Sequence, residues 1–347
     1  MQFKTVASSP FLPPANGVSR VMRQVLLALA PGTLAAIWYF GWGVLINLIL
    51  AILCAVAFEA LALKLRGRDP LPYLKDYSAI VTAWLLALAL PQLAPWWIVV
   101  CGVFFAIIIA KHLYGGLGYN PFNPAMVAYV SLLISFPAYM THWVAPSPIS
   151  EHSLGLLESI KVIFGGSLME HNLFDSITMA TPLDSIKTGL TQHKTIDEIR
   201  SGAVFGSLGG VGWEWVANWY ALGGFYLLYK RVISWRIPVA LIFALGVPAG
   251  IFYLSNPDHF ASPVFHIFSG GAILGAFFIA TDPVSGSATP RGRVIFGAGV
   301  GLLTFIIRTW GGYPDAIAFS VLLMNMATPL IDHYTKPRVF GQRGHHG

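Results

Sequence analysis

The sequence predicts an all-α membrane protein of about ten transmembrane helices, arranged as two inverted five-helix repeats with a large outer loop between helices five and six. Hydrophobic residues make up 56% of the 347 residues and charged residues 10%, against about 25% charged residues in soluble proteins. The mean hydropathy is +0.67. So few charges cannot cover a water-facing surface, and most of the chain must therefore face lipid or other helices.

The transmembrane helices are predicted from unbroken apolar runs, because a lipid-spanning helix needs roughly 20 mostly apolar residues. Open sheet cannot face lipid, so each run is expected to be helical. The ten runs lie at about 22–41, 43–63, 77–93, 95–113, 123–144, 213–229, 236–254, 263–281, 294–310 and 314–332.

Orientation follows from the positions of the basic residues. With the N-terminus inside, sixteen of the 21 Lys and Arg residues fall on the inner side and five on the outer side. Cytoplasmic loops of membrane proteins carry such an excess of Lys and Arg. Both termini are therefore predicted to be cytoplasmic. The outer five are Lys161, Lys187, Lys194, Arg200 and Arg308.

The runs divide the chain into an N-terminal repeat (1–145), an outer loop (146–212), a C-terminal repeat (213–333) and a cytoplasmic tail (334–347). Two long apolar runs end in a similar way, with a basic residue shortly before a Gly-Gly pair. These residues are Lys111, followed by His-Leu-Tyr-Gly-Gly, and Arg308, followed by Thr-Trp-Gly-Gly. Because five helices per repeat is an odd number, the repeats are expected to be inverted. A Gly-Gly pair after a cation is also common at helix ends, so this similarity has a simpler explanation as well.

The polar outer loop contains the segment Asp175-Ser176-Ile177-Thr178-Met179-Ala180-Thr181-Pro182-Leu183-Asp184. The small Ala180 lets a bulky group approach the hydroxyl of Thr181, and Pro182 stiffens the chain after it. Threonine is a poor nucleophile without a base or a metal. The segment therefore predicts an acceptor of a covalent modification, with no catalytic residue and no metal site.

This segment resembles the flavinylation motif of membrane subunits in ion-pumping redox complexes, a family that includes the D subunits of Rnf complexes (RnfD) and the B subunits of sodium-pumping NADH:quinone oxidoreductases. The resemblance implies FMN bound covalently through a phosphoester to Thr181, with Asp175, Thr178 and Ala180 completing the motif. Met179 stands where the family typically has glycine. The resemblance covers essentially the whole chain, including Asn120-Pro121-Phe122-Asn123-Pro124-Ala125 and Ala280-Thr281-Asp282-Pro283.

The resemblance implies a multi-pass subunit of an ion-translocating oxidoreductase (a translocase) in the bacterial inner membrane. Electron transfer between ferredoxin and NAD would be coupled to Na+ or H+ movement, with the FMN as an electron relay. The implied partners are other membrane and peripheral subunits, a second FMN subunit among them, the flavin transferase that attaches FMN, and the lipid bilayer. This chain is expected to hold no complete active site and to bind no nucleic acid.

Two other functions remain open. One is the B subunit of the sodium-pumping quinone reductase, against which the short region before the first run argues. The other is a non-redox transporter or channel for small solutes, which an inverted repeat permits because fold alone does not determine function. Flavin retained by the denatured polypeptide would discriminate against the second.

A second Ala-Thr-Pro sequence occurs at Ser287-Ala288-Thr289-Pro290. Pro283 replaces the acid six residues before Thr289, and Gly286 replaces the hydroxyl residue three before it. This site also falls on the predicted cytoplasmic side, whereas in the family the flavin transferase works outside the inner membrane. Thr181 is therefore the predicted attachment site.

Two further segments are candidate flavin contacts. Gly206 and Ser207 begin a glycine-rich turn whose backbone N–H groups could hold a phosphate; a flexible re-entry into the membrane explains the glycines equally well. Asn120 and Asn123 could bind the polar edge of a ring, and the related B subunit holds a second, non-covalent riboflavin within its helix bundle. The alternative for these asparagines is a simple helix-start turn.

Ionisable residues within the apolar runs are candidates for an ion path. Glu59, His266 and Asp282 are the main ones, and His142, Asp258, Arg308 and Asp315 lie near the outer edge. No chain of acids crosses the membrane, so most of these residues are expected at helix ends or interfaces. Cys54 and Cys101 form no C-x-x-C motif, which excludes an iron–sulfur cluster or thiolate zinc site from this chain alone.

Overall fold

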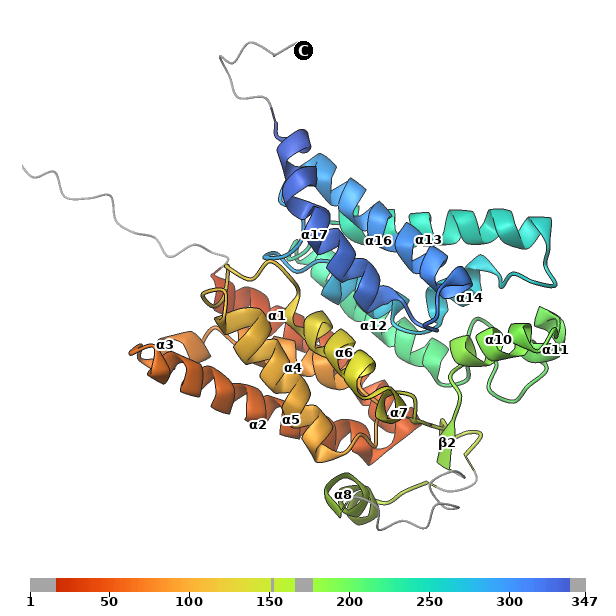
Figure 1. Ribbon diagram of the computed structural model, residues 1–347, viewed down its shortest axis with the longest axis horizontal. Coiled ribbons are helices and arrows are strands. Elements are labelled where there is room, and N and C mark those ends of the chain that lie inside the picture. Colours follow the sequence, from red (N-terminus) through yellow and green to blue (C-terminus); the bar gives the residue numbers. More distant parts are fainter. Residues whose placement is uncertain (1–16, 151–152, 166–176, 338–347) are drawn as a thin grey trace, which may run out of the picture.

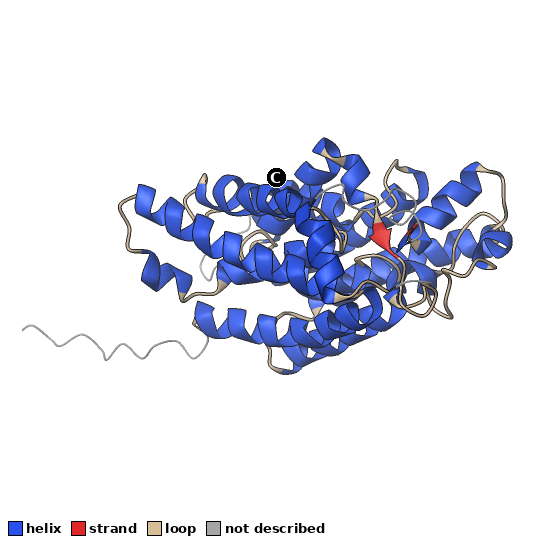
Figure 2. Ribbon diagram, turned by 90° about the horizontal axis from the view of Figure 1, so that it is seen from below, coloured by secondary structure: helices blue, strands red, loops and turns tan. Residues whose placement is uncertain are grey.

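The computed structural model describes residues 17–150, 153–165 and 177–337, and these residues are almost entirely helical (Figures 1 and 2). Asp175 lies outside them. The first half contains α1 (Val18–Phe40), α2 (Trp42–Leu65), α3 (Pro70–Leu74), α4 (Ser78–Ala89), α5 (Trp96–Phe104), the π-helix η1 (Phe105–His112), α6 (Pro124–Ser135) and α7 (Pro137–Met140). The second half contains α12 (Trp213–Tyr229), α13 (Arg236–Ser255), α14 (Pro263–Phe268), α15 (Ala272–Leu274), the π-helix η2 (Gly275–Ile279), α16 (Pro290–Trp310) and α17 (Ile317–Thr335).

Four of the described helices, α1, α2, α13 and α16, are long and apolar enough to cross a membrane. Three shorter apolar helices span Ser78–Ala89, Trp96–His112 and Pro124–Ser135. The prediction of an all-α, multi-pass membrane protein is confirmed at this level. The layout of ten spans in two repeats stays a prediction.

Two of the predicted unbroken runs are interrupted in the structure. The run 123–144 is helical only to Ser135, because Pro137 has no backbone N–H to continue the helix and starts α7 instead. The run 263–281 breaks between α14 and α15, where Gly270 adopts φ +62°. A Cβ at Gly270 would lie 2.6 Å from a carboxylate oxygen of Asp315, so this break requires glycine both for its backbone conformation and for space.

A two-stranded antiparallel sheet attaches the outer loop to the first half. β1 (Trp143–Val144) pairs with β2 (Thr178–Met179), placing Trp143 opposite Met179 and Val144 opposite Thr178. The amide of Ala145 extends the pairing with a 2.9 Å hydrogen bond to the carbonyl of Ile177. The last residues of the fifth predicted span are therefore strand and not helix.

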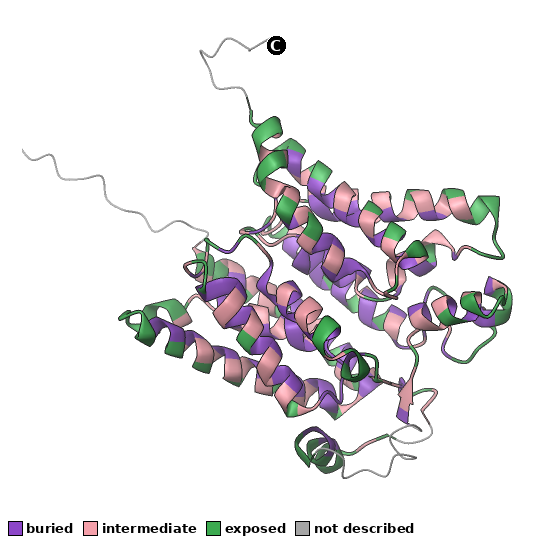
Figure 3. Ribbon diagram, in the orientation of Figure 1, coloured by how far each residue is buried: buried purple, intermediate pink, exposed green. Residues whose placement is uncertain are grey.

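The two halves share one hydrophobic core, in which α1 packs on α12 and α6 packs on α17. Within the first half α2 packs on α4 and α5, and within the second half α13 packs on α14 and α16. Buried residues face the helix contacts, whereas α3 and much of α8 are exposed (Figure 3).

The described residues of the outer loop form the helices α8 (Leu156–Gly165), α10 (Pro182–Thr191) and α11 (Ile196–Arg200). They dock at separate places. Helix α8 packs Val162 and Ile163 against Leu93 and Ile177. Helices α10 and α11 share a small apolar cluster with Phe265 of α14. The described part of the segment that resembles a flavinylation motif, Ile177 to Thr181, connects these two docked parts.

Candidate functional site

Thr181 lies between β2 and α10, as the N-cap residue of α10. Its Oγ1 accepts a 3.2 Å hydrogen bond from the N–H of Asp184, and Pro182 occupies the first helical position, where a backbone N–H is not needed. The side chain of Thr181 is half-buried and Ala180 beside it is exposed. The threonine hydroxyl is thus held at the start of a helix, next to a small residue.

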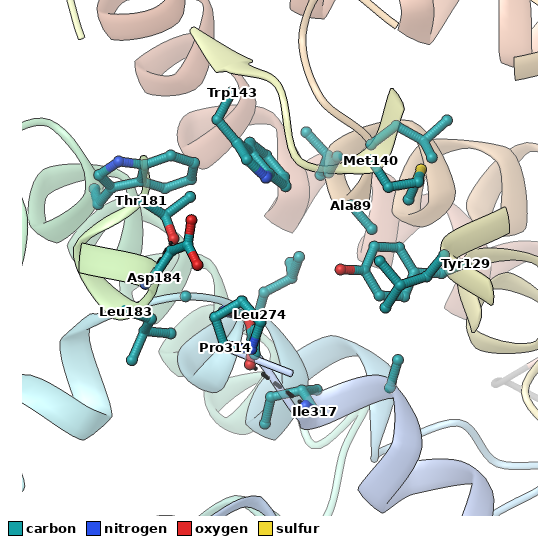
Figure 4. Close-up of a pocket in the computed structure, with 18 of the residues that line it drawn as sticks. Ala89, Tyr129, Met140, Trp143, Thr181, Leu183, Asp184, Leu274, Pro314 and Ile317 are labelled. Atoms are coloured by element: carbon teal, nitrogen blue, oxygen red, sulfur yellow. Dashed lines mark hydrogen bonds between the residues drawn. The ribbon is translucent and has the colours of Figure 1, made fainter. Parts of the chain in front are cut away.

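Thr181 lines a cavity of about 400 Å³ between the two halves of the protein. This volume falls within the usual range of small-molecule sites. In Figure 4, Thr181 and Asp184 lie on one side of the cavity, and Tyr129 and Met140 lie on the other. Residues from α1, α4, α6, α12, α15 and α17 complete the wall, so the cavity is a product of the tertiary fold.

The aromatic residues that line this cavity include Phe40, Trp143 and Trp213, which lie close to the outer loop. The Trp143 and Trp213 rings meet edge to face, with their centroids 5.3 Å apart. The centroid of the Phe40 ring lies 4.4 Å from that of Trp213. Such faces suit a flat conjugated ring. Trp215, by contrast, is 53% exposed. Trp143 and Tyr129 were missed as site residues because they lie in a run that the sequence predicts to be one lipid-spanning helix.

Charged groups beside Thr181 are partly buried. Burial raises the pKa of the Asp184 carboxyl above its ordinary value, and the nearby Lys187 ammonium opposes that shift. Burial lowers the pKa of Lys187, which donates hydrogen bonds to the carbonyls of Tyr313 (3.1 Å) and Arg308 (3.5 Å). Lys187 therefore attaches α10 to the end of α16. The positive N-terminal end of α10 favours an anion on Thr181.

Arg308 and Asp315 connect the cavity wall to the break between α14 and α15. The Arg308 guanidinium donates to Asp315 Oδ1 (2.9 Å), to the carbonyl of Ser269 (3.1 Å) and to that of His266. Asp315 Oδ2 accepts the N–H of Gly271 at 2.6 Å. One cluster therefore contains His266, Arg308 and Asp315, which the sequence predicts separately within a span or near the outer edge. Asp315 also lines the cavity.

A comparison with known protein families matches residues 5–341 to the family described as NQR2, RnfD, RnfE. The chain belongs to this family. It is 53% identical over 345 residues to an Aeromonas hydrophila protein named as the D subunit of an ion-translocating oxidoreductase complex, covering 97% of this chain and 99% of the relative. Proteins of the same name from Vibrio cholerae serotype O1 and Aeromonas salmonicida are 53% and 52% identical, with the same coverage. The family resemblance seen in the sequence is confirmed.

The glycine-rich turn at Gly206 and Ser207 binds a carboxylate of the protein itself. The N–H groups of Leu208 and Gly209 donate to Glu214 Oε2 at 2.8 and 3.0 Å, and the Ser207 hydroxyl lies 3.4 Å from Oε1. A phosphate would have to displace Glu214 from these donors. The turn nevertheless adjoins the motif, because Gly210 packs so closely on Pro182 that a Cβ would overlap the proline ring.

Asn120 and Asn123 line a second cavity, of about 600 Å³. Asn123 has the helix-start role: its Oδ1 accepts the N–H groups of Ala125 and Met126, and its Nδ2 donates to the carbonyl of Ile279 at 3.3 Å. The Asn120 amide nitrogen donates to the carbonyl of Phe122 at 3.0 Å, but its Oδ1 is buried without a hydrogen-bond partner among the described residues. Of the two asparagines, Asn120 is therefore the one that offers an acceptor to a ligand.

The three ion-path candidates belong to separate hydrogen-bonded groups within the described residues. Glu59 lies 2.9 Å from the Lys111 ammonium and 3.2 Å from Nε2 of His112, all three being buried. The carboxylate of Asp282 accepts the hydroxyl of Ser285 at the end of the η2 segment. His266 belongs to the Arg308 cluster. Glu59 is thus half of a buried ion pair.

Proposed function

We propose that this chain is the D subunit of an Rnf-type ion-translocating oxidoreductase complex of the bacterial inner membrane and carries FMN covalently on Thr181 as an electron relay. One observation carries the proposal: the threonine hydroxyl of the motif lies in the wall of an aromatic-lined cavity between the two halves. The relatives are named as D subunits of ion-translocating oxidoreductase complexes, which favours this assignment over the quinone reductase B subunit.

The residues around Thr181 fit an FMN phosphoester. The ester leaves one negative charge, which the N-terminus of α10 stabilises. The indoles of Trp143 and Trp213 offer apolar faces and edges to the flavin ring. Asp175, Thr178 and Ala180 are proposed as the features that the transferase reads. FMN itself supplies the capacity to take up and release electrons.

The glycine-rich turn has a different role in this proposal. The turn that begins at Gly206 holds Glu214 through the Ser207 hydroxyl and the N–H groups of Leu208 and Gly209. The absence of a side chain at Gly210 then leaves space for the Pro182 ring. The phosphate is therefore assigned to the helix N-terminus at Thr181. In this proposal the glycines allow the turn to pack beside Pro182 and do not bind the phosphate.

We also propose the layout of ten spans in two inverted repeats. Each half contains a buried cation near the end of a long helix. This cation bonds an acidic side chain and also a residue beside a helix start. Lys111 bonds Glu59 and the hydroxyl of Ser78, the first residue of α4. Arg308 bonds Asp315 and the carbonyl of Ser269, just before α15. This correspondence favours the interpretation of the two Gly-Gly segments as equivalent positions of a repeat.

In this role the complex couples electron transfer between ferredoxin and NAD to Na+ or H+ translocation. The ferredoxin and NAD sites, and a second FMN, belong to other subunits. A flavin transferase would load Thr181 from the outer side. A second, non-covalent flavin such as riboflavin is proposed for the 600 Å³ cavity, where Asn120 Oδ1 could accept a ring N–H.

The decisive experiment compares Thr181→Val with Thr289→Val. A phosphoester survives denaturation, so the wild-type band should fluoresce under ultraviolet light in a denaturing gel, and Thr181→Val should abolish that fluorescence. Thr289 is a matched control because it also caps a helix, α16, and is also followed by proline. Loss of either cap costs about 1 kcal/mol, so a general folding effect would darken both bands.

A fluorescent Thr181→Val band would contradict the assignment of FMN to Thr181. A wild-type complex without any flavin would favour the non-redox transporter instead. Co-purified subunits, identified by mass spectrometry, would separate an Rnf-type complex from a quinone reductase.

A further inference from the structure

Helix α8 in the outer loop has three distinct sides. With 100° between successive residues, Ser159, Val162 and Ile163 share one side, which is buried against the protein. Glu158 and Lys161 share another and are exposed. Between these sides lies an exposed apolar face. Its members are Leu156, Leu157, Ile160 and Phe164, which are 43%, 73%, 37% and 49% exposed.

The position of α8 indicates what covers this face. Helix α8 packs on α2, and Ile46 of α2 contacts its buried cluster. In Figure 1, α8 is seen end-on while α2 runs across the view, so the two axes cross steeply. Helix α2 begins at Trp42, so Ile46 lies near the predicted outer end of α2, and a helix that crosses α2 steeply there runs along the plane of the membrane and not through it.

The surface of α2 continues the apolar face of α8 into the membrane. Trp42, Ile46, Ile49 and Leu53 follow one another at spacings of four, three and four residues, which places them on one side of α2. Trp42, Ile49 and Leu53 are 43%, 50% and 63% exposed. Ile46 lies only about 4.5 Å along the axis from Ile49. Trp42, at the end of α2, is typical of the lipid–water interface.

We propose that α8 is an interfacial helix that inserts Leu157, Ile160 and Phe164 into the outer leaflet of the bilayer and keeps Glu158 and Lys161 in water. Amphipathic helices bind at this depth through their apolar face. The continuous apolar surface with α2 favours lipid over a protein partner, since the same leaflet covers both helices. The proposal does not depend on FMN.

An interfacial α8 would also position the flavinylation motif. Ile177, four residues before Thr181, packs in the same cluster as Val162 and Ile163 of α8. Ile177 would therefore be held at the membrane surface. This gives the outer loop an attachment to lipid in addition to its attachments to the helix bundle.

The test measures nitroxide accessibility in the full-length protein and in the assembled complex, both in nanodiscs of phosphatidylcholine and phosphatidylglycerol. Spin labels are placed by Leu157→Cys, Phe164→Cys and, as the matched control on the polar side, Lys161→Cys, in a Cys54→Ala, Cys101→Ala background. Oxygen concentrates in lipid and a neutral nickel chelate in water. The ratio of oxygen to nickel collision rates should be several-fold higher at 157 and 164 than at 161.

Three results would overturn the proposal. A high nickel collision rate at both 157 and 164 would place the apolar face in water. Low rates for both reagents in the assembled complex alone would identify another protein of the complex as the occupant. Low rates for both in the isolated chain as well would mean that another part of this chain covers the face. Two label sites on that face guard against one disruptive substitution.

Discussion

Arg308 at the end of α16 and Asp315 just before α17 form an ion pair of 2.9 Å across the turn that joins the two helices. The same guanidinium binds the carbonyls of His266 and Ser269, and the same carboxylate binds the amide of Gly271. One pair of side chains thus holds an interrupted helix, a helix–helix turn and the wall of the cavity beside Thr181. The helix break is stable because its freed carbonyls have a charged donor.

Arg308→Met should destabilise the protein strongly, because it leaves Asp315 and two buried carbonyls without their donor. Breaking a buried ion pair costs about 3 kcal/mol or more; Asp315 is 28% exposed, which favours the low end. Unfolding in mixed SDS micelles, followed by near-ultraviolet circular dichroism, measures this loss. Arg293→Met is the control and should cost clearly less, because this arginine of the same helix donates a 3.3 Å hydrogen bond to the carbonyl of Ser287 and forms no ion pair among the described residues. Equal losses would contradict the role given to Arg308.

The buried pair of Glu59 and Lys111 should show strong coupling in a double-mutant cycle. Glu59→Gln leaves the Lys111 ammonium buried without its counter-charge, which should cost about 3 kcal/mol. Adding Lys111→Met to Glu59→Gln should recover much of that loss, because no unpaired charge remains. The same SDS titration applies, and additive losses would show that the two side chains do not stabilise each other. Ion transport by the single variant in assembled complex separates structural loss from an ion-path role.

Gly210→Ala should lower flavin content at Thr181 without unfolding the helix bundle. The added methyl group would overlap the Pro182 ring and displace the residue next to the proposed attachment site. In-gel flavin fluorescence, normalised to protein, measures the effect. Gly155→Ala is the control, because its Cβ would be 3.6 Å from the nearest atom, an ordinary contact. Wild-type fluorescence in Gly210→Ala would show that this packing does not position Thr181.

Cysteine labelling should place Lys194 and Arg231 on opposite sides of the membrane. Both side chains are exposed, and the distribution of basic residues puts Lys194 outside and Arg231 inside. An impermeant maleimide should label Lys194→Cys in intact spheroplasts and Arg231→Cys only after lysis. The reverse pattern would invert the topology and place Thr181 away from the proposed transferase.

The apolar runs, the basic residues and the Thr181 motif could all be interpreted from the sequence, because each depends on composition or on neighbouring residues. The positions where helices break were only partly predictable. Pro137 is a visible helix breaker, yet the apolar composition around it favoured one continuous span. At Gly270 the break depends on Asp315 and Arg308, which lie far along the chain.

The sequence by itself determined the membrane class, the family and the threonine of the candidate attachment site, since lipid solubility and a contiguous motif are local properties. The tertiary structure alone decided that Glu214 occupies the amides of the glycine-rich turn and that Asn123 is used as a helix cap while Asn120 is not. It also decided that Trp143 and Trp213 meet beside Thr181. Hydrogen-bond partners and cavity walls come from segments brought together by packing, and their identity depends on distances that no local pattern encodes.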